Sequence, residues 1–186
     1  MEQKKRTDQP YISSSQNLPE VTPKVFILSV LLSVILGAAN AYLGLFAGMT
    51  VSASIPAAVI SMAIFRLFRT SNILENNMVQ TVASAGEAIA GGVIFTMPAL
   101  LILGTWQKFN YWETTLIASL GGVLGMLFTI PLRRAMIVEN PLQFPEGVAT
   151  AEVLKVGDTG GTEVNTIAAA GAIGALFKLG ETGLRL

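Results

Sequence analysis

The chain has 186 residues, of which 52% are hydrophobic and 13% are charged, and its formal net charge is zero. Soluble domains average about 25% charged residues, so this composition excludes an ordinary soluble domain, and the neutral balance gives no indication of a nucleic-acid partner. The sequence has no cysteine and no histidine, which excludes disulfides, thiol or imidazole catalysis and the common zinc and haem sites. We therefore expect no enzymatic activity, no cofactor and no metal site.

Charged residues are missing from three long stretches of the sequence. These uncharged runs cover residues 25–65 (41 residues), 88–107 (20 residues) and 114–132 (19 residues). About 20 apolar residues cross a bilayer as a helix, so the first run is long enough to cross twice. The pattern predicts an all-α, polytopic membrane protein with about five transmembrane helices, at approximately 25–45, 49–68, 78–104, 114–132 and 164–182.

Lysine and arginine are distributed unequally between the two sides of this arrangement. Residues 1–24 read as a basic tail, and five spans place nine Lys and Arg residues on the side of this tail and three on the other side. Positive residues favour the cytoplasmic side of a membrane. We therefore expect the N-terminus and the tail to be cytoplasmic.

The first two predicted spans carry small and polar residues near their junction. Residues 37–44 are rich in glycine and alanine, which let neighbouring helices approach closely, so this half should pack inside the bundle. Pro56 is expected to kink the second span. The polar candidates for a substrate contact are Asn40, Thr50, Ser52 and Ser54. Such residues also commonly hydrogen-bond a neighbouring helix, and both roles are open.

The third predicted span carries a polar stripe. Its members recur at steps of three or four residues, which places them on one face of a helix: Asn76, Gln80, Ser84, Glu87 and Gly91. Lipid cannot satisfy polar groups, so the stripe must face protein or water. Glu87 is the leading candidate for a proton or substrate site, with Gln80 and Ser84 nearer the cytoplasmic side of the same pathway. The alternative is that this span begins near Ala88 and leaves Glu87 in a loop.

The connector after the fourth span contains a short predicted helix. Pro145 followed by Glu146 is typical of a first helical turn, and Gly157 suits a helix end, so a helix of about three turns is expected near 145–156. Its expected packed face carries Val148, Ala151 and Leu154. It is either a surface helix at the cytoplasmic interface or a re-entrant element whose N-terminus lines the pathway. The fifth span has only 14 uncharged residues, 164–177, and is either a short packed span or the start of a longer one.

The string Phe-Pro-Glu-Gly-Val-Ala-Thr-Ala-Glu-Val-Leu at 144–154 resembles a signature of the oligopeptide transporter (OPT) superfamily. The hairpin from Asn40 to Met62 and the stretch 83–92 are similar to the bacterial members, and the resemblance extends from about residue 21 to 166. The residues that carry the signature are Phe144, Pro145, Glu146, Gly147, Ala149, Thr150 and Ala151.

This resemblance implies a secondary, proton-coupled importer of oligopeptides or peptide-like metal chelates in the bacterial inner membrane. It also implies a full-length protein of more than a dozen helices, of which residues 25–186 would be the N-terminal part of the transmembrane domain. The expected partners are the substrate, protons, the lipid bilayer, and the remaining transporter helices or another membrane subunit. The competing hypothesis is a non-transporting membrane scaffold or partner subunit that is inactive alone.

Overall fold

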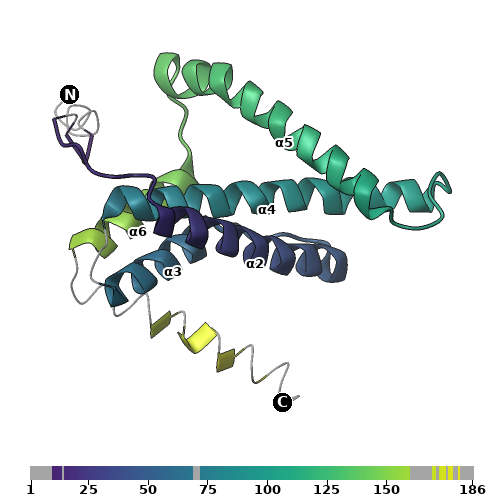
Figure 1. Ribbon diagram of the computed structural model, residues 1–186, viewed down its shortest axis with the longest axis horizontal. Coiled ribbons are helices and arrows are strands. Elements are labelled where there is room, and N and C mark those ends of the chain that lie inside the picture. Colours follow the sequence, from purple (N-terminus) through teal and green to yellow (C-terminus); the bar gives the residue numbers. More distant parts are fainter. Residues whose placement is uncertain are drawn as a thin grey trace.

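The computed structural model describes residues 10–13, 15–68 and 72–159, together with isolated positions between 169 and 180. The described chain is helical. Its elements are α2 (Pro23–Ala47), α3 (Ser54–Leu67), α4 (Ile73–Ile102), α5 (Tyr111–Arg133), the short π-helix η1 (Arg134–Glu139) and α6 (Pro145–Thr159), arranged as in Figure 1. Three apolar helices are long enough to cross a membrane, namely α2, α4 and the continuous α5–η1, and α3 is a shorter apolar helix. The predicted all-α, polytopic membrane fold is confirmed.

The ends of α2 and α4 follow from local sequence. Pro23 occupies the first turn of α2, where its missing N–H costs no helical hydrogen bond. The same helix stops at Gly48, which has φ +70° and donates its N–H to the Gly44 carbonyl. Asn72 caps α4 by accepting a hydrogen bond from the Glu75 N–H at 2.9 Å. These signals set both ends of α2 and the start of α4.

Helices α2 and α4 pack closely and run in the same direction. A Cβ atom at Gly44 would lie 2.8 Å from the Ile94 side chain, and one at Gly86 would lie 1.8 Å from the Ser33 hydroxyl. Glycine at these positions lets the two backbones approach. The small-residue half of the first span is therefore packed inside the bundle, as predicted.

The second predicted span is wrong at its start. Residues 48–53 are not helical, and α3 begins only at Ser54. Its 14 residues are about 21 Å long at 1.5 Å per residue, short of the roughly 30 Å apolar core of a bilayer. Pro56 consequently lies in the first turn of α3, where no helical hydrogen bond is lost, and is not a mid-helix kink.

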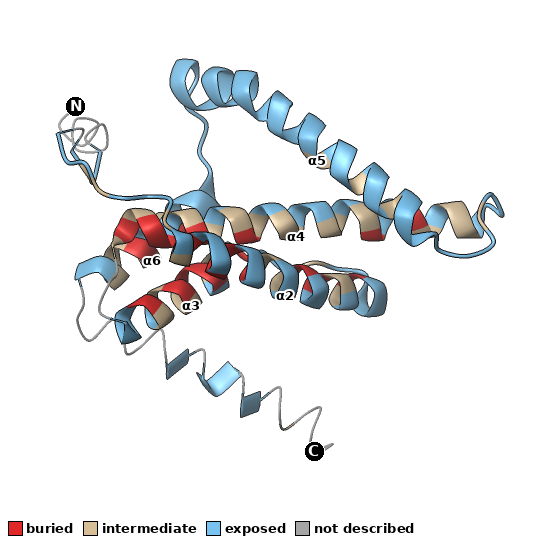
Figure 2. Cartoon of the chain, viewed as in Figure 1, coloured by how far each residue is buried: buried red, intermediate tan, exposed pale blue. Residues whose placement is uncertain are grey.

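Helices α5 and α6 differ in how closely they pack against the other helices. No residue of α5 is buried, and Figure 2 shows this helix almost wholly exposed as it diverges from α4. In contrast, α6 packs on α3 and α4, where Leu154 joins Ala58 and Ile73 in a small apolar cluster. Helix α6 continues to Thr159, past the predicted end, because Gly157 packs directly beneath Met62. The fifth predicted span, 164–182, falls largely outside the described residues.

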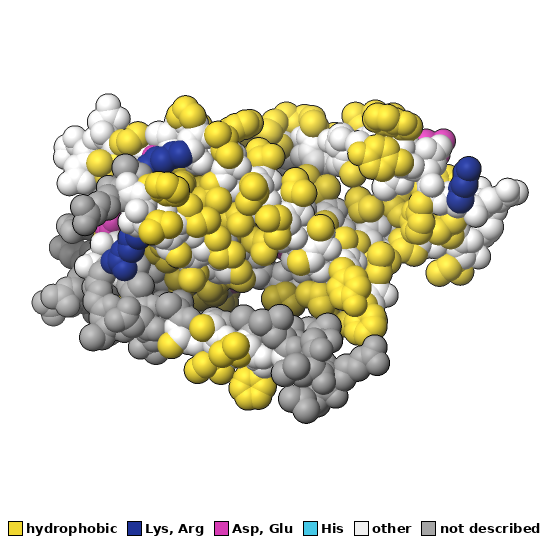
Figure 3. Space-filling view, turned by 60° about the horizontal axis from the view of Figure 1, so that its bottom comes forward, with side chains coloured by type: hydrophobic (Ala, Val, Ile, Leu, Met, Phe, Trp, Pro, Cys, Tyr) yellow, Lys and Arg dark blue, Asp and Glu magenta, His cyan; other side chains and the backbone are white. Residues whose placement is uncertain are grey.

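The outer surface matches a lipid environment. Figure 3 shows hydrophobic side chains over most of one face, with lysine and arginine toward its two ends. Large apolar side chains such as Phe26, Phe46 and Phe128 are more than half exposed. An exposed apolar surface of this extent is expected where lipid replaces water as the solvent.

The close α2–α4 contact generates a stability prediction. Replacing Gly86 by leucine should force α2 and α4 apart and lower the free energy of unfolding in detergent by about 1–3 kcal/mol, as overpacking does elsewhere. The matched control is Gly92→Leu on the same helix, because a Cβ there meets nothing within 4 Å. Circular dichroism during thermal unfolding measures both. Equal stability of the two variants would contradict the packing described above.

Candidate functional site

A non-helical segment, residues 48–53, follows α2 and leads back toward the middle of α4. The buried Asn40 side chain holds this segment by two hydrogen bonds: its amide donates to the Val51 carbonyl at 2.9 Å, and its oxygen accepts from the Val51 N–H at 2.7 Å. The Thr50 methyl group lies beside Gly91 of α4. Asn40 therefore supports backbone that lacks helical hydrogen bonds, and Thr50 lies next to the stripe.

Three elements meet where α3 begins. The Ser54 hydroxyl lies 2.6 Å from the Ser84 hydroxyl of α4 and donates at 3.2 Å to the Glu146 carboxylate of α6. Ser52 donates to the same carboxylate oxygen. Ser84 is about 17 Å from the start of α4 by helical rise. The contacts place two serines, the first turn of α3 and the first turn of α6 around one carboxylate, beside the middle of α4.

Glu87 completes this cluster. It lies inside α4, one turn beyond Ser84, so the alternative that placed it in a loop is wrong. Its half-buried carboxyl group lies near the backbone N–H of Ala53 and within electrostatic range of Glu146. Among the described residues, the recorded ion pairs involve neither Glu87 nor Glu146. Neither acidic side chain thus has a recorded basic partner in the described part of the chain.

The short helix α6 packs against α3 and α4, with its first turn beside Ser54. It runs alongside α3 in the same direction, from Glu146 near Ser54 to Gly157 near Met62. Its buried residues are Thr150 and Leu154, whereas Val148 is 60% exposed, so the predicted packed face was displaced. Thr150 donates to the Glu146 carbonyl, which ties the first turn together.

The remaining signature residues flank this first turn of α6. Phe144 precedes the helix and is 45% exposed, and its Cβ lies 3.7 Å from the position that a Cβ at Gly147 would take. The first helical residue is Pro145. Ala149 is exposed and Ala151 half-buried. Among the signature residues, Glu146 is the one whose side chain reaches the serines of the cluster.

The polar residues of the stripe on α4 make different contacts. Asn76 is buried and accepts from the Ser61 hydroxyl of α3 at 3.0 Å. Ser84 and Glu87 belong to the cluster at the start of α3. Gln80 instead contacts its own helix, donating to Asn77 and Thr81. The stripe therefore faces α3 at Asn76 and Ser84, and Gln80 lies outside that contact.

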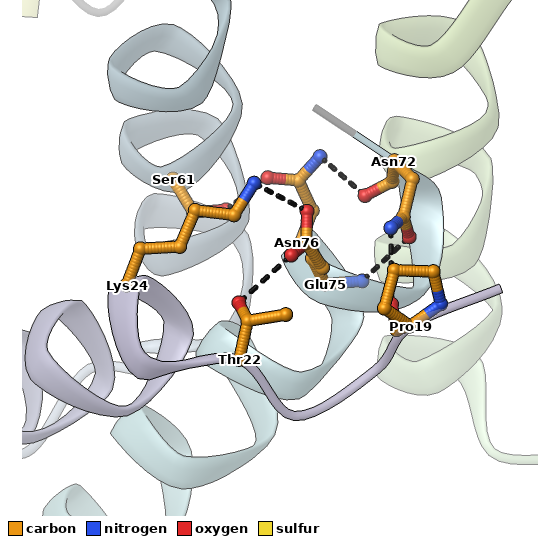
Figure 4. A network of polar contacts seen from close by, with 7 residues as sticks. All are labelled: Pro19, Thr22, Lys24, Ser61, Asn72, Glu75 and Asn76. Carbon is orange, nitrogen blue, oxygen red and sulfur yellow. Dashed lines mark hydrogen bonds and ion pairs between the residues drawn. The ribbon is translucent and has the colours of Figure 1, made fainter. Parts of the chain in front are cut away.

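A second polar network was missed at the start of α4 (Figure 4). Glu75 is 2% exposed, and its carboxylate pairs with the Lys24 ammonium at 2.8 Å and accepts from the Thr22 hydroxyl at 2.8 Å. Lys24 also lies over the Phe65 ring, 4.9 Å from its centroid. The Asn-x-x-Glu spacing of a helix cap, Asn72 to Glu75, marks this helix start in the sequence, but nothing in the spacing indicates the lysine 51 positions earlier.

The cluster of Ser52, Ser54, Ser84, Glu87 and Glu146 has a defined chemistry. Carboxylates and hydroxyls together accept hydrogen bonds from a cation such as a protonated amine, and a carboxylate binds a proton directly. No group of three or more potential metal ligands occurs in the described chain. The arrangement is therefore suited to protons and ammonium groups.

Comparison with known proteins covers most of the chain. The family model described as OPT oligopeptide transporter protein matches residues 20–180. The "Putative oligopeptide transporter" of Haemophilus influenzae is 53% identical over 147 residues, covering 78% of this chain and 23% of that protein. The metal-nicotianamine transporter YSL3 of Arabidopsis thaliana is 30% identical over 152 residues, covering 69% of this chain and 22% of that protein. The chain thus spans less than a quarter of these relatives' length. No solved structure matches it.

The Asn40 contacts generate a second prediction. Asn40→Ala removes both hydrogen bonds to Val51, each of which is worth about 0.5–1.5 kcal/mol in a typical protein. Hydrogen exchange of the peptide covering residues 48–53, followed by mass spectrometry, should become about tenfold faster or more. Asn77→Ala is the control, because Asn77 is exposed and accepts only from residues on its own helix. Unchanged exchange in Asn40→Ala would show that this side chain does not hold the segment.

Proposed function

Because the chain belongs to the OPT oligopeptide transporter family, we propose that it forms part of a secondary transporter that takes up oligopeptides or peptide-like metal chelates together with protons. The observation that supports this proposal is the cluster at the start of α3, where the Glu146 carboxylate accepts from Ser52 and Ser54 and lies within electrostatic range of Glu87. Broken helices near the middle of the membrane are where secondary transporters commonly bind substrate and coupling ions.

The two carboxylates provide a physical reason for proton coupling. When both are ionised they repel each other, and one bound proton or one ammonium group relieves that repulsion. A protein that moves a proton and a substrate through the same cluster links their binding through this shared charge. Glu87 is the proposed exchanging group, since it lies on the membrane-crossing helix α4, and Glu146 is its partner.

The proposed substrate chemistry follows from the same cluster. A peptide carries an N-terminal ammonium group, which suits a pair of carboxylates, and amide groups, which suit serine hydroxyls. The relatives supply two classes, since one is named as an oligopeptide transporter and another as a metal-nicotianamine transporter. Both classes carry amines and carboxylates, so both remain within the proposal.

Entry to the site is proposed from the end of the bundle where α4 begins. In the proposal, the distribution of nine against three basic residues puts this side in the cytoplasm, and the similarity to a bacterial relative supports a bacterial inner membrane. Gln80 lies half-buried between this end and Ser84, and it stays a candidate pathway residue. Asn40 and Thr50 act in the proposal by holding and lining the non-helical segment.

One observation favours the competing function of a membrane scaffold or partner subunit. Helix α5 has no buried residue, so within the described chain it offers a full apolar surface to other helices. Co-purification with a second membrane protein, combined with no uptake in proteoliposomes when the chain is joined to its missing transporter helices, would favour that function over transport.

Transport is testable in a chimera in which this chain replaces the aligned segment of the Haemophilus influenzae relative. Glu87→Gln keeps the shape of the side chain but removes its exchangeable charge, so proton-driven uptake into proteoliposomes should fall at least tenfold while protein yield is unchanged. Glu152→Gln is the control, because Glu152 is exposed and pairs only with Lys155. Uptake by Glu87→Gln with the same rate and pH profile as the parent chimera would refute the proposed role.

A further inference from the structure

A groove runs between α4 and α5, where α5 diverges from α4 in Figure 1. Its volume is about 830 Å³. Both walls carry glycines at which an added Cβ would meet nothing within 4 Å: Gly92 on α4, and Gly121 and Gly125 on α5. The walls are therefore smooth and recessed, and they leave room for another backbone to approach closely.

Apart from Arg133 at the end of α5, the groove offers almost no free hydrogen-bonding groups. Three threonines line it, and each hydroxyl donates to a carbonyl of its own helix: Thr81 to Asn77, Thr96 to Gly92 and Thr129 to Gly125. Their methyl groups are left for the groove. A polar substrate would lose its water here without gaining partners, so the groove is distinct from the serine and glutamate cluster and suits an apolar occupant.

Small residues on both walls favour a helix over lipid as that occupant. Membrane helices associate through small residues that permit close backbone packing. All three glycines of α5 line the groove, whereas Leu120, Leu124 and Leu127 do not. One helix thus presents two different faces.

We propose that the groove between α4 and α5 is the seat of a further transmembrane helix, contributed by the part of the transporter that its relatives contain and these 186 residues do not cover. The relatives contain enough additional sequence to supply such a helix, because the aligned segment is only 23% of the Haemophilus influenzae protein. The seated helix gives α5 the buried contacts that it lacks within the described chain. This inference concerns how the helices of the transporter assemble, and it does not depend on which substrate the protein transports.

Photo-crosslinking in the chimera described above identifies the occupant. A benzophenone amino acid at Met126, which lines the groove, should crosslink to a peptide of the chimera outside this chain, as read by mass spectrometry after proteolysis. The same probe at Leu124, which is 56% exposed and does not line the groove, should label mainly lipid. Crosslinks from Met126 only to lipid, or only to a second copy of the chimera, would overturn the proposal.

Filling the groove provides an independent readout. Gly121→Leu combined with Gly125→Leu should lower the thermal unfolding midpoint of the chimera by 5 °C or more and change that of the 186-residue chain alone much less, because an added Cβ at either position meets no described atom within 4 Å. Val123→Leu, which adds bulk outside the groove, should change neither protein. Equal midpoints for the chimera with and without the filled groove would refute a seated helix. Transport failure with these crosslinks intact would instead count only against the proposed function.

Discussion

Backbone that crosses a membrane without helical hydrogen bonds must find other partners, and in this chain the side chain of Asn40 supplies them. Its amide satisfies both the N–H and the carbonyl of Val51, so residues 48–53 can return in a non-helical form along the bundle. The start of α3 then falls beside the middle of α4. Without this pairing, the chain would be expected to form one continuous second span, and the serines and Glu146 would have no common meeting point.

Two kinds of contact hold the bundle together, and they have different consequences. Helices α2 and α4 meet through glycines at distances that leave no space for water, which makes this pair a rigid scaffold. Helix α3 meets α4 through hydroxyls and amides, at Ser54 with Ser84 and at Ser61 with Asn76. Hydrogen bonds of this kind exchange readily with water or with a polar ligand. The α3 side of α4 is therefore the side on which the proposed substrate would compete for contacts.

The sequence was sufficient for the long helices because their signals are local. Uncharged length, a proline start at Pro23 and a glycine end at Gly48 predict α2 without reference to other segments. The break before Ser54 was not predicted. It depends on Asn40, eleven residues before Val51, and a hydropathy profile shows Asn40 only as one polar residue in an apolar run. Glu87 was identified from helical spacing. Its nearness to Glu146, 59 positions later, depends on how α6 folds back, which no local pattern encodes.

Two acidic residues of α4, one buried and one half-buried, differ in whether a basic side chain compensates their charge. This difference distinguishes a structural role from the proposed functional role. Glu75 is almost fully buried and has Lys24 and Thr22 as partners, so its charge is compensated permanently and ties α4 to the segment before α2. Glu87 lies twelve residues later and is only half-buried, and its recorded neighbours are an amide and another acid. In the proposed function, the charge of Glu87 is compensated by a proton or an ammonium group that enters and leaves. A carboxylate with a fixed cation could not exchange in this way, which is why the unpaired acid, and not the buried one, is the group on which the proposed coupling depends.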